Sequence, residues 1–296
     1  MNNTAFKYNR SINSYLFILP TYILFILFVL IPLFQAFDIS LQKYNILGNS
    51  KYIGFKNYLK LFDDSRLIVM YSNTVFFTFF AVIFNTSIGL LLAVMLNQRM
   101  PNLVRNLYRS IFFFPLLLAH SYIAIIWKFL YQKDTGAFNY YITNFGFDPI
   151  PWLNSAEWVL PSIIIMDVWK NTGFAMLIFL AGLQNIPKDV IEASVLDGAN
   201  KLKIFIFIKL PLLTPTILFV LVVFMIGAFQ VFDSIVVLTD GGPGDASRSV
   251  TMYIYHLAFE KFDMGYASAV SMTLFLIILL LTIFQFWLSK RWVHYE

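Results

Sequence analysis

The sequence predicts an all-α integral membrane protein with six transmembrane helices, and three observations lead to this fold class. Of the 296 residues, 59% are hydrophobic and only 12% are charged, whereas a soluble domain carries about 25% charged residues. The apolar residues gather in long runs, and about 20 such residues suffice for a helix to cross about 30 Å of hydrocarbon. The runs are continuous rather than alternating, which excludes a transmembrane β-barrel.

Six stretches qualify as spans, at about residues 15–37, 71–96, 110–130, 158–183, 212–238 and 265–288. Each is expected to be a helix, because a lone segment in lipid must satisfy its own backbone hydrogen bonds. The first span follows Lys7 and Arg10 as a signal peptide would, but it is too long and lacks a small-residue cleavage site, so we interpret it as retained. Residues 1–296 are therefore predicted to form a single transmembrane domain.

Composition also limits the chemistry of the chain. There is no cysteine, so disulfides and thiolate metal sites are excluded. The three histidines, His120, His256 and His294, are scattered, and we predict no metal site. The net charge of +5 is interpreted as the positive residues of the cytoplasmic loops rather than as a nucleic-acid surface.

The distribution of Lys and Arg predicts the orientation. With the N-terminus inside, the cytoplasmic parts contain Lys7, Arg10, Arg99, Arg105, Arg109, Lys188, Lys201, Lys203, Lys209, Lys290 and Arg291. The external loops also hold cations, but most of the acids of the chain lie there too. Both termini and the loop 184–211 are therefore expected in the cytoplasm.

The loop 184–211 has a local pattern that predicts two short helices at an angle. Pro187 suits the first turn of a helix over Lys188–Leu196, and Gly198 supplies a sharp bend or a left-handed cap. Four apolar side chains of this helix are available to a packing face: Val190, Ile191, Val195 and Leu196. The loop is either an amphipathic connector on the headgroups or a docking helix for a cytoplasmic partner, and the glycine bend favours docking.

The spacing within this loop resembles the EAA loop of binding-protein-dependent ABC importer permeases. Glu192-Ala-Ser194 is followed after three residues by Gly198 and after nine more by Ile208-Lys-Leu-Pro211, with Ser194 in place of the second alanine of the motif. The resemblance implies the type I importer permease fold and a cytoplasmic coupling helix that inserts into an ATP-binding subunit. The coupling residues implied by it are Glu192, Ala193, Ser194, Asp197, Gly198 and Pro211.

Other motifs are similar to the carbohydrate-uptake branch of that family, which includes maltose and glycerol-phosphate permeases. They are Leu238-Thr-Asp-Gly-Gly-Pro243, Gly54-Phe-Lys-Asn-Tyr58, Gly265-Tyr-Ala-Ser-Ala269, and Trp127 with Asp134-Thr-Gly136 and Asn139. The resemblance implies a second homologous permease, two cytoplasmic ATP-binding subunits and an extracytoplasmic solute-binding protein as partners. It also implies a multi-pass protein in the lipid of a prokaryotic cell membrane.

Polar residues inside the predicted spans are the candidates for a substrate pathway, because a mid-membrane charge costs about 2.5–3.5 kcal/mol. Asp167 and Asn171 are four residues apart and share a helix face, and by the resemblance they fall where the maltose permease lines its sugar site. Trp169 is expected to be an aromatic platform, and Gln230 with Asp233 completes the candidate set. The alternative for these residues is hydrogen bonding between helices, or pairing of Asp167 with Lys170.

The sequence thus predicts a permease subunit of an ABC importer for a sugar or oligosaccharide. The chain has no Gly-x-x-x-x-Gly-Lys-Ser/Thr loop, so it is not expected to be an enzyme, and ATP and Mg²⁺ would be bound by the partner ATPase. Glycerol-phosphate is the alternative substrate, with Lys170 as its cationic partner. An ion-coupled transporter using Asp167 or Asp233 would show repeats and broken helices, and a membrane enzyme would show clustered acids or histidines; the sequence shows neither.

Overall fold

The computed structural model describes residues 15–45, 48 and 50–294, so Lys7 and Arg10 lie outside the described residues. Its contacts divide the chain into two compact units. Unit 1 comprises Met1–Asp63 and Ile254–Leu274, and unit 2 comprises Asp64–Tyr253 and Phe275–Glu296. All the candidate functional residues lie in unit 2.

Four of the predicted spans are confirmed as uninterrupted helices of sufficient length and apolarity. They are Tyr15–Ser40, α4 (Ser65–Leu96), α8 (Val159–Asn185) and α15 (Met264–Ser289). The first includes a π-helical turn, η1 (Ile26–Leu30), before α2 (Ile31–Ser40). Among the described residues there are therefore four candidate spans, or up to six if two bent helix pairs each count as one.

The predicted continuous helix 110–130 is wrong, because this region is sharply bent. Helix α5 (Asn102–Phe113) continues into a 3₁₀ turn, η2 (Phe114–Leu117), and then bends by 100° into α6 (His120–Leu130). Pro115 lies at the start of η2, where it cannot supply a backbone donor to a continuing α-helix. Leu118 and Ala119 are extended and place His120 at the beginning of α6.

The predicted continuous helix 212–238 is also wrong. A 63° bend separates Lys201–Leu212 from α12 (Thr214–Phe229), and a second break precedes α13 (Asp233–Thr239). Gln230 ends α12 and Asp233 begins α13, so the two residues do not share one helix as predicted. The sequence disfavours an ion-coupled transporter partly because no broken helices are expected from it. That expectation is also wrong, since two helices in the described part of the chain are broken.

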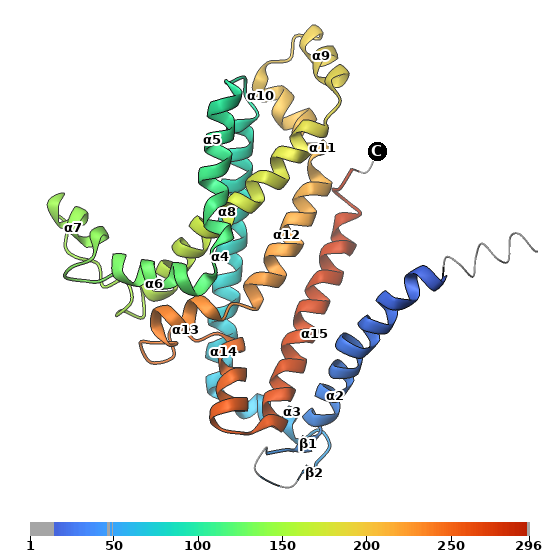
Figure 1. The fold of residues 1–296 in the computed structure, drawn as a ribbon, viewed down its shortest axis with the longest axis vertical. Coiled ribbons are helices and arrows are strands. Elements are labelled where there is room, and N and C mark those ends of the chain that lie inside the picture. Colours follow the sequence, from blue (N-terminus) through green and yellow to red (C-terminus); the bar gives the residue numbers. More distant parts are fainter. Residues whose placement is uncertain (1–14, 46–47, 49, 295–296) are drawn as a thin grey trace, which may run out of the picture. The chain divides into compact units, whose positions relative to one another are not determined.

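The core of unit 2 is the contact between α4 and α8, which pack along most of their lengths, with α12 against α4 and α13 against α6. Two glycines allow neighbouring helices to approach α8 and α4 closely. A Cβ atom at Gly89 of α4 would collide with Ala175 of α8, and one at Gly173 of α8 would collide with the carbonyl oxygen of Phe112 in α5. Figure 1 shows α4 running through unit 2, with α9 near one end and α13 and α14 (Val250–Tyr255) toward the other.

Unit 1 shows the structural role of two sequence motifs, Gly54-Phe-Lys-Asn-Tyr58 and Gly265-Tyr-Ala-Ser-Ala269. It contains α2, the short antiparallel ribbon β1 (Gln42–Lys43) and β2 (Lys51–Tyr52), α3 (Lys56–Asp63), the π turn η4 (His256–Glu260) and the first part of α15. Buried Asn57 donates to the carbonyl oxygens of Ser40 (2.8 Å) and Gln42 (2.9 Å). A Cβ at Gly265 would collide with that same Gln42 oxygen. Both motifs therefore fix the backbone around β1.

Candidate functional site

A polar cavity of about 340 Å³ lies within unit 2. Its walls come from α4, η2, the start of α6, α8, α12 and the broken segment before α13. The lining residues are Phe77, Ala81, Val82, Asn85, Leu116, His120, Asp167, Asn171, Phe174, Val223, Phe224, Gly227, Ala228, Gln230, Val231, Phe232, Asp233 and Ser234. Four of the five residues predicted for the substrate pathway are thus brought to one cavity.

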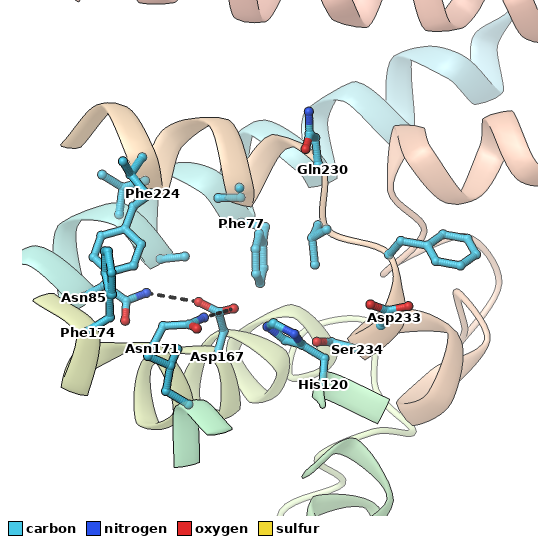
Figure 2. Close-up of a pocket in the computed structure, with 18 residues that line it drawn as sticks. Phe77, Asn85, His120, Asp167, Asn171, Phe174, Phe224, Gln230, Asp233 and Ser234 are labelled. Atoms are coloured by element: carbon cyan, nitrogen blue, oxygen red, sulfur yellow. Dashed lines mark hydrogen bonds between the residues drawn. The ribbon is translucent and has the colours of Figure 1, made fainter. Parts of the chain in front are cut away.

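Asp167 is the centre of a hydrogen-bond network that joins α4 to α8 (Figure 2). Asn85 Nδ2 donates to Asp167 Oδ2 at 3.0 Å, and Asn171 Nδ2 donates to Oδ1 at 2.8 Å. Thr172 Oγ1 lies 3.4 Å from Asn85 Oδ1 and also donates to the Val168 carbonyl at 2.6 Å. The predicted shared face of Asp167 and Asn171 is confirmed, and the two amides hold the carboxylate toward the cavity.

A second set of polar side chains reaches the cavity from the two broken helices. His120 opens α6, and Asp233 with Ser234 opens α13; Figure 2 shows these three side chains on one side of Asp167. Gln230 lines the cavity, but its amide extends away from Asp167 and His120 in that view. The breaks therefore bring His120, Asp233 and Ser234 into the cavity wall. In continuous helices these side chains would lie elsewhere.

Trp169, the predicted aromatic platform, does not line this cavity. Its side chain is 48% exposed and lies outside the cavity, in a separate apolar groove beside Phe76, Phe80 and Phe84. The ring packs 5.6 Å from that of Trp127. Residues two apart on a helix point about 200° apart, so Trp169 cannot share the face of Asp167.

The aromatic wall is made by phenylalanines that sequence reasoning missed. Phe77, Phe174 and Phe224 line the cavity, and the last two form an edge-to-face pair with ring centres 6.0 Å apart. Helical periodicity could have found Phe174, since it lies three residues after Asn171. Lys170 is buried, with 3% of its surface exposed, but it does not line the cavity.

The loop 184–211 forms the predicted short helix at one end of unit 2. Helix α9 (Lys188–Leu196) begins after Pro187, and Gly198 has a φ of +79°. The Ala199 amide donates to the Ser194 carbonyl and the Gly198 amide to the Val195 carbonyl, both at 3.0 Å, which is the bonding pattern of a Schellman cap. A second helical segment follows, made of α10 (Lys201–Ile204), η3 (Phe205–Lys209) and α11 (Leu210–Leu212).

Most of α9 is exposed, which differs from the predicted packing face. Ile191 packs into the core of unit 2 and Ser194 is buried. In contrast, Val190, Val195 and Leu196 are exposed, Leu196 to 88%. Glu192, Ala193, Asp197 and Gly198 are exposed as well, whereas Pro211 is half-buried in α11. The predicted coupling residues other than Ser194 and Pro211 therefore lie on an open surface.

A polar cavity enclosed by apolar helices, with a solvent-facing helix at one end, is the arrangement of a membrane transport subunit. The chain belongs to the family of binding-protein-dependent transport system inner membrane components, whose model matches residues 85–294. Together with the similarity to sugar-transport permeases described next, this match confirms the predicted ABC transporter permease of the sugar-uptake branch, and the chain is a transport subunit rather than an enzyme.

The relatives span nearly the whole chain. The trehalose/maltose transport system permease protein MalF of Thermococcus litoralis is 35% identical over 278 residues, covering 94% of this chain and 93% of the relative. The sn-glycerol-3-phosphate transport system permease protein UgpA of Escherichia coli O157:H7 is 31% identical over 286 residues, covering 95% of each chain. A chain of a bacterial ABC transporter involved in the import of the acidic polysaccharide alginate has the same fold, with a TM-score of 0.85, 24% identity, and coverage of 98% of this chain and 99% of that chain.

Proposed function

We propose that this chain is one permease subunit of an ABC importer that carries a neutral sugar or oligosaccharide through the polar cavity. The observation that carries the proposal is the composition of the cavity wall. Amide, carboxylate, imidazole and hydroxyl groups share the wall with four phenyl rings, and among the described residues no Lys or Arg lines the space.

The chemistry of the wall suits a sugar. A carboxylate has about four acceptor sites, and the amides of Asn85 and Asn171 use only one each on Asp167. The remaining acceptor sites of Asp167 can receive sugar hydroxyls, while the amides can both donate and accept. The phenyl rings of Phe77, Phe174 and Phe224 offer apolar surface to the C–H faces of a sugar ring.

The charge of the wall favours a neutral substrate over an anionic one. Asp167 and Asp233 both line the cavity, whereas the buried Lys170 does not. An anionic substrate would meet carboxylates without a lining cation, and like charges repel at short range in a low dielectric. Glycerol-phosphate, the substrate named for UgpA, is therefore the alternative, and the trehalose or maltose named for MalF is chemically closer to this wall.

The energy for transport would enter through α9. In this proposal α9 lies in the cytoplasm and inserts into one of two ATP-binding subunits, which hold ATP and Mg²⁺. The exposed Glu192 and Leu196 support such a contact, because an exposed apolar side chain bordered by polar ones is typical of a protein–protein contact surface.

The remaining partners follow from the family. A second homologous permease would complete the pathway, and an extracytoplasmic solute-binding protein would deliver the sugar to the outer face; both chain termini would be cytoplasmic. Closure of the ATP-binding subunits would move α9 and rock the helices around the cavity. Hydrolysis of ATP would then reset them.

The test is uptake by proteoliposomes that contain both permeases and the ATP-binding subunits, with the solute-binding protein outside. Radiolabelled trehalose, maltose and larger neutral oligosaccharides are compared with glycerol-phosphate and alginate oligosaccharides. We expect saturable, ATP-dependent uptake of a neutral sugar that survives a proton ionophore. Uptake of the anionic compounds alone would overturn the neutral-substrate proposal, and uptake that persists without the ATP-binding subunits would overturn the coupling proposal.

A further inference from the structure

A second cavity, of about 660 Å³, lies behind α9 and has no role in the transport proposal. We call it the basic cavity. It is bounded by the ends of α4 and α8, the inner side of α9, and the segment from α10 to η3. Its lining residues are Val94, Asn97, Gln98, Arg99, Leu183, Ile191, Val195, Lys201, Ile204, Phe205 and Lys209.

The charge of the basic cavity is of one sign. Arg99, Lys201 and Lys209 line it, and among the described residues no Asp or Glu does. None of these three cations forms an ion pair within the part of the chain that the structure describes. The Arg99 wall is held in place by Arg105, whose Nη2 donates to the Gln98 carbonyl at 3.3 Å and to the Met100 carbonyl at 3.5 Å. Such a wall is built to receive an anion.

The basic cavity also has an apolar side that continues along α4. Leu183, Ile191 and Ile204 lie in its wall. On α4, the exposed Leu91 precedes the lining residue Val94 by three residues, so the two side chains are neighbours on the helix surface. An apolar strip thus leads directly to the cationic lining.

The depth of the basic cavity matches a lipid headgroup. The uncharged run of α4 ends at Leu96, and the polar Asn97, Gln98 and Arg99 follow at once. This step from apolar to cationic side chains is where a span leaves the hydrocarbon, and basic pockets between helices at this level bind anionic headgroups.

We propose that the basic cavity binds the phosphate headgroup of an anionic phospholipid, with an acyl chain lying along Val94 and Leu91. A free phosphate would have the same charge, but it would gain nothing from the apolar strip. The bound lipid would contact Ile191 and Val195 of α9 from behind and so restrain the position of α9 against unit 2. This inference does not depend on which substrate the transporter carries.

The test measures lipid retention by the assembled transporter. The complex is purified from membranes or nanodiscs that contain equal amounts of phosphatidylglycerol and phosphatidylcholine, and native mass spectrometry counts the lipids retained. We expect preferential retention of phosphatidylglycerol by the unaltered complex. Each of Arg99→Gln, Lys201→Gln and Lys209→Gln is expected to weaken retention by about fivefold, the typical effect of one cation at a membrane surface.

Lys203 provides a matched control. It lies in the same short helix as Lys201, is exposed, and does not line the basic cavity. Lys203→Gln makes the same change of charge and is expected to leave lipid retention unchanged. Lys201→Arg preserves the charge and is expected to keep the lipid. Retention in Lys201→Arg together with loss in Lys201→Gln would show that the charge, and not misfolding, causes the loss.

The outcomes are distinct. Equal retention of both lipids, or equal loss in Lys201→Gln and Lys203→Gln, would overturn the proposal. Displacement of phosphatidylglycerol by millimolar inorganic phosphate or glycerol-phosphate, with tighter binding of the soluble anion, would identify the ligand as a free phosphate instead. ATP-dependent uptake measured on the same preparations reports the transport proposal separately, so the failure of one does not imply the failure of the other.

Discussion

The polar cavity and helix α9 differ in where their candidate functional side chains face. In the cavity the polar groups of Asn85, Asp167 and Asn171 are turned inward and bonded to one another across α4 and α8. On α9 the charged Glu192 and the apolar Leu196 face outward. All the residues that line the cavity therefore belong to unit 2, whereas α9 presents an exposed surface that a partner would bury in the proposed complex.

This difference means that the two regions need different things from the fold. The cavity needs close packing of long helices, because its wall is shared by several of them. Helix α9 needs only a correct local backbone, since its proposed docking surface lies on a single turn. Substitutions in α9 should therefore weaken assembly with a partner, whereas substitutions in the cavity wall should lower the stability of the permease or its affinity for substrate.

The largest expected effect is that of Glu192→Ala on assembly. If Glu192 is buried against an ATP-binding subunit, its loss weakens that contact by about 2 kcal/mol or more, or about 30-fold. Thermal unfolding of the permease should be unchanged, because Glu192 is exposed. Co-purification of the ATP-binding subunits and ATP-dependent uptake measure the effect.

Asp148→Ala is the control for that experiment, since it removes an exposed carboxylate far from α9 in the sequence. It is expected to leave co-purification intact. Normal assembly and uptake in Glu192→Ala would show that α9 does not couple through this residue.

The second effect is on packing. A Cβ at Gly173 would collide with the backbone oxygen of Phe112, so Gly173→Ala must push α8 away from α5. Overpacking of this kind costs about 2 kcal/mol, and we expect a lower thermal midpoint of the purified permease. Gly227→Ala is the matched control, because no atom lies within 4 Å of its Cβ position. An unchanged midpoint in Gly173→Ala would mean that the contact between α5 and α8 is not tight.

The sequence was most informative where a function lies on one continuous stretch. Pro187, the helix Lys188–Leu196 and the bend at Gly198 were all predicted from neighbouring residues, and the structure contains each of them. The apolar runs likewise predicted the four unbroken spans, because length and hydropathy are local properties.

The cavity was less predictable because its wall is assembled from separate helices. Asp167 and Asn171 could be paired by helical spacing, but Asn85 joins them only through tertiary packing. His120 and Asp233 reach the wall through two helix breaks, of which the first is marked in the sequence by Pro115, whereas no proline marks the second, at residues 230–232. Trp169 was chosen for its residue type, but its position two residues after Asp167 places it on another face and outside the cavity.

The third prediction sharpens the cavity assignment. In Asp167→Asn, one of the two carboxylate oxygens becomes an amide nitrogen, which cannot accept the sugar hydroxyl that the proposal assigns to Asp167. Loss of one hydrogen bond between the sugar and a charged group costs about 1.5 kcal/mol, so we expect the KM for sugar uptake to rise about tenfold. Trp169→Ala is the control, since this side chain lies outside the cavity, and its KM should not change. An equal rise in both variants would refute the cavity as the sugar site.

The smallest effect is expected at Gly198, where the backbone matters and the side-chain space does not. Its φ of +79° is left-handed, and no atom lies within 4 Å of its Cβ position. Gly198→Ala should therefore cost only the left-handed conformation, about 1 kcal/mol, and lower uptake about fivefold if α9 must hold this bend to dock.

Asparagine tolerates the left-handed region better than alanine, so Gly198→Asn should retain more uptake than Gly198→Ala although its side chain is larger. That order distinguishes a conformational requirement from a steric one. If uptake instead falls with side-chain size, from alanine to asparagine, then Gly198 is covered by the ATP-binding subunit. The docking surface would in that case extend past the end of α9 to the bend itself.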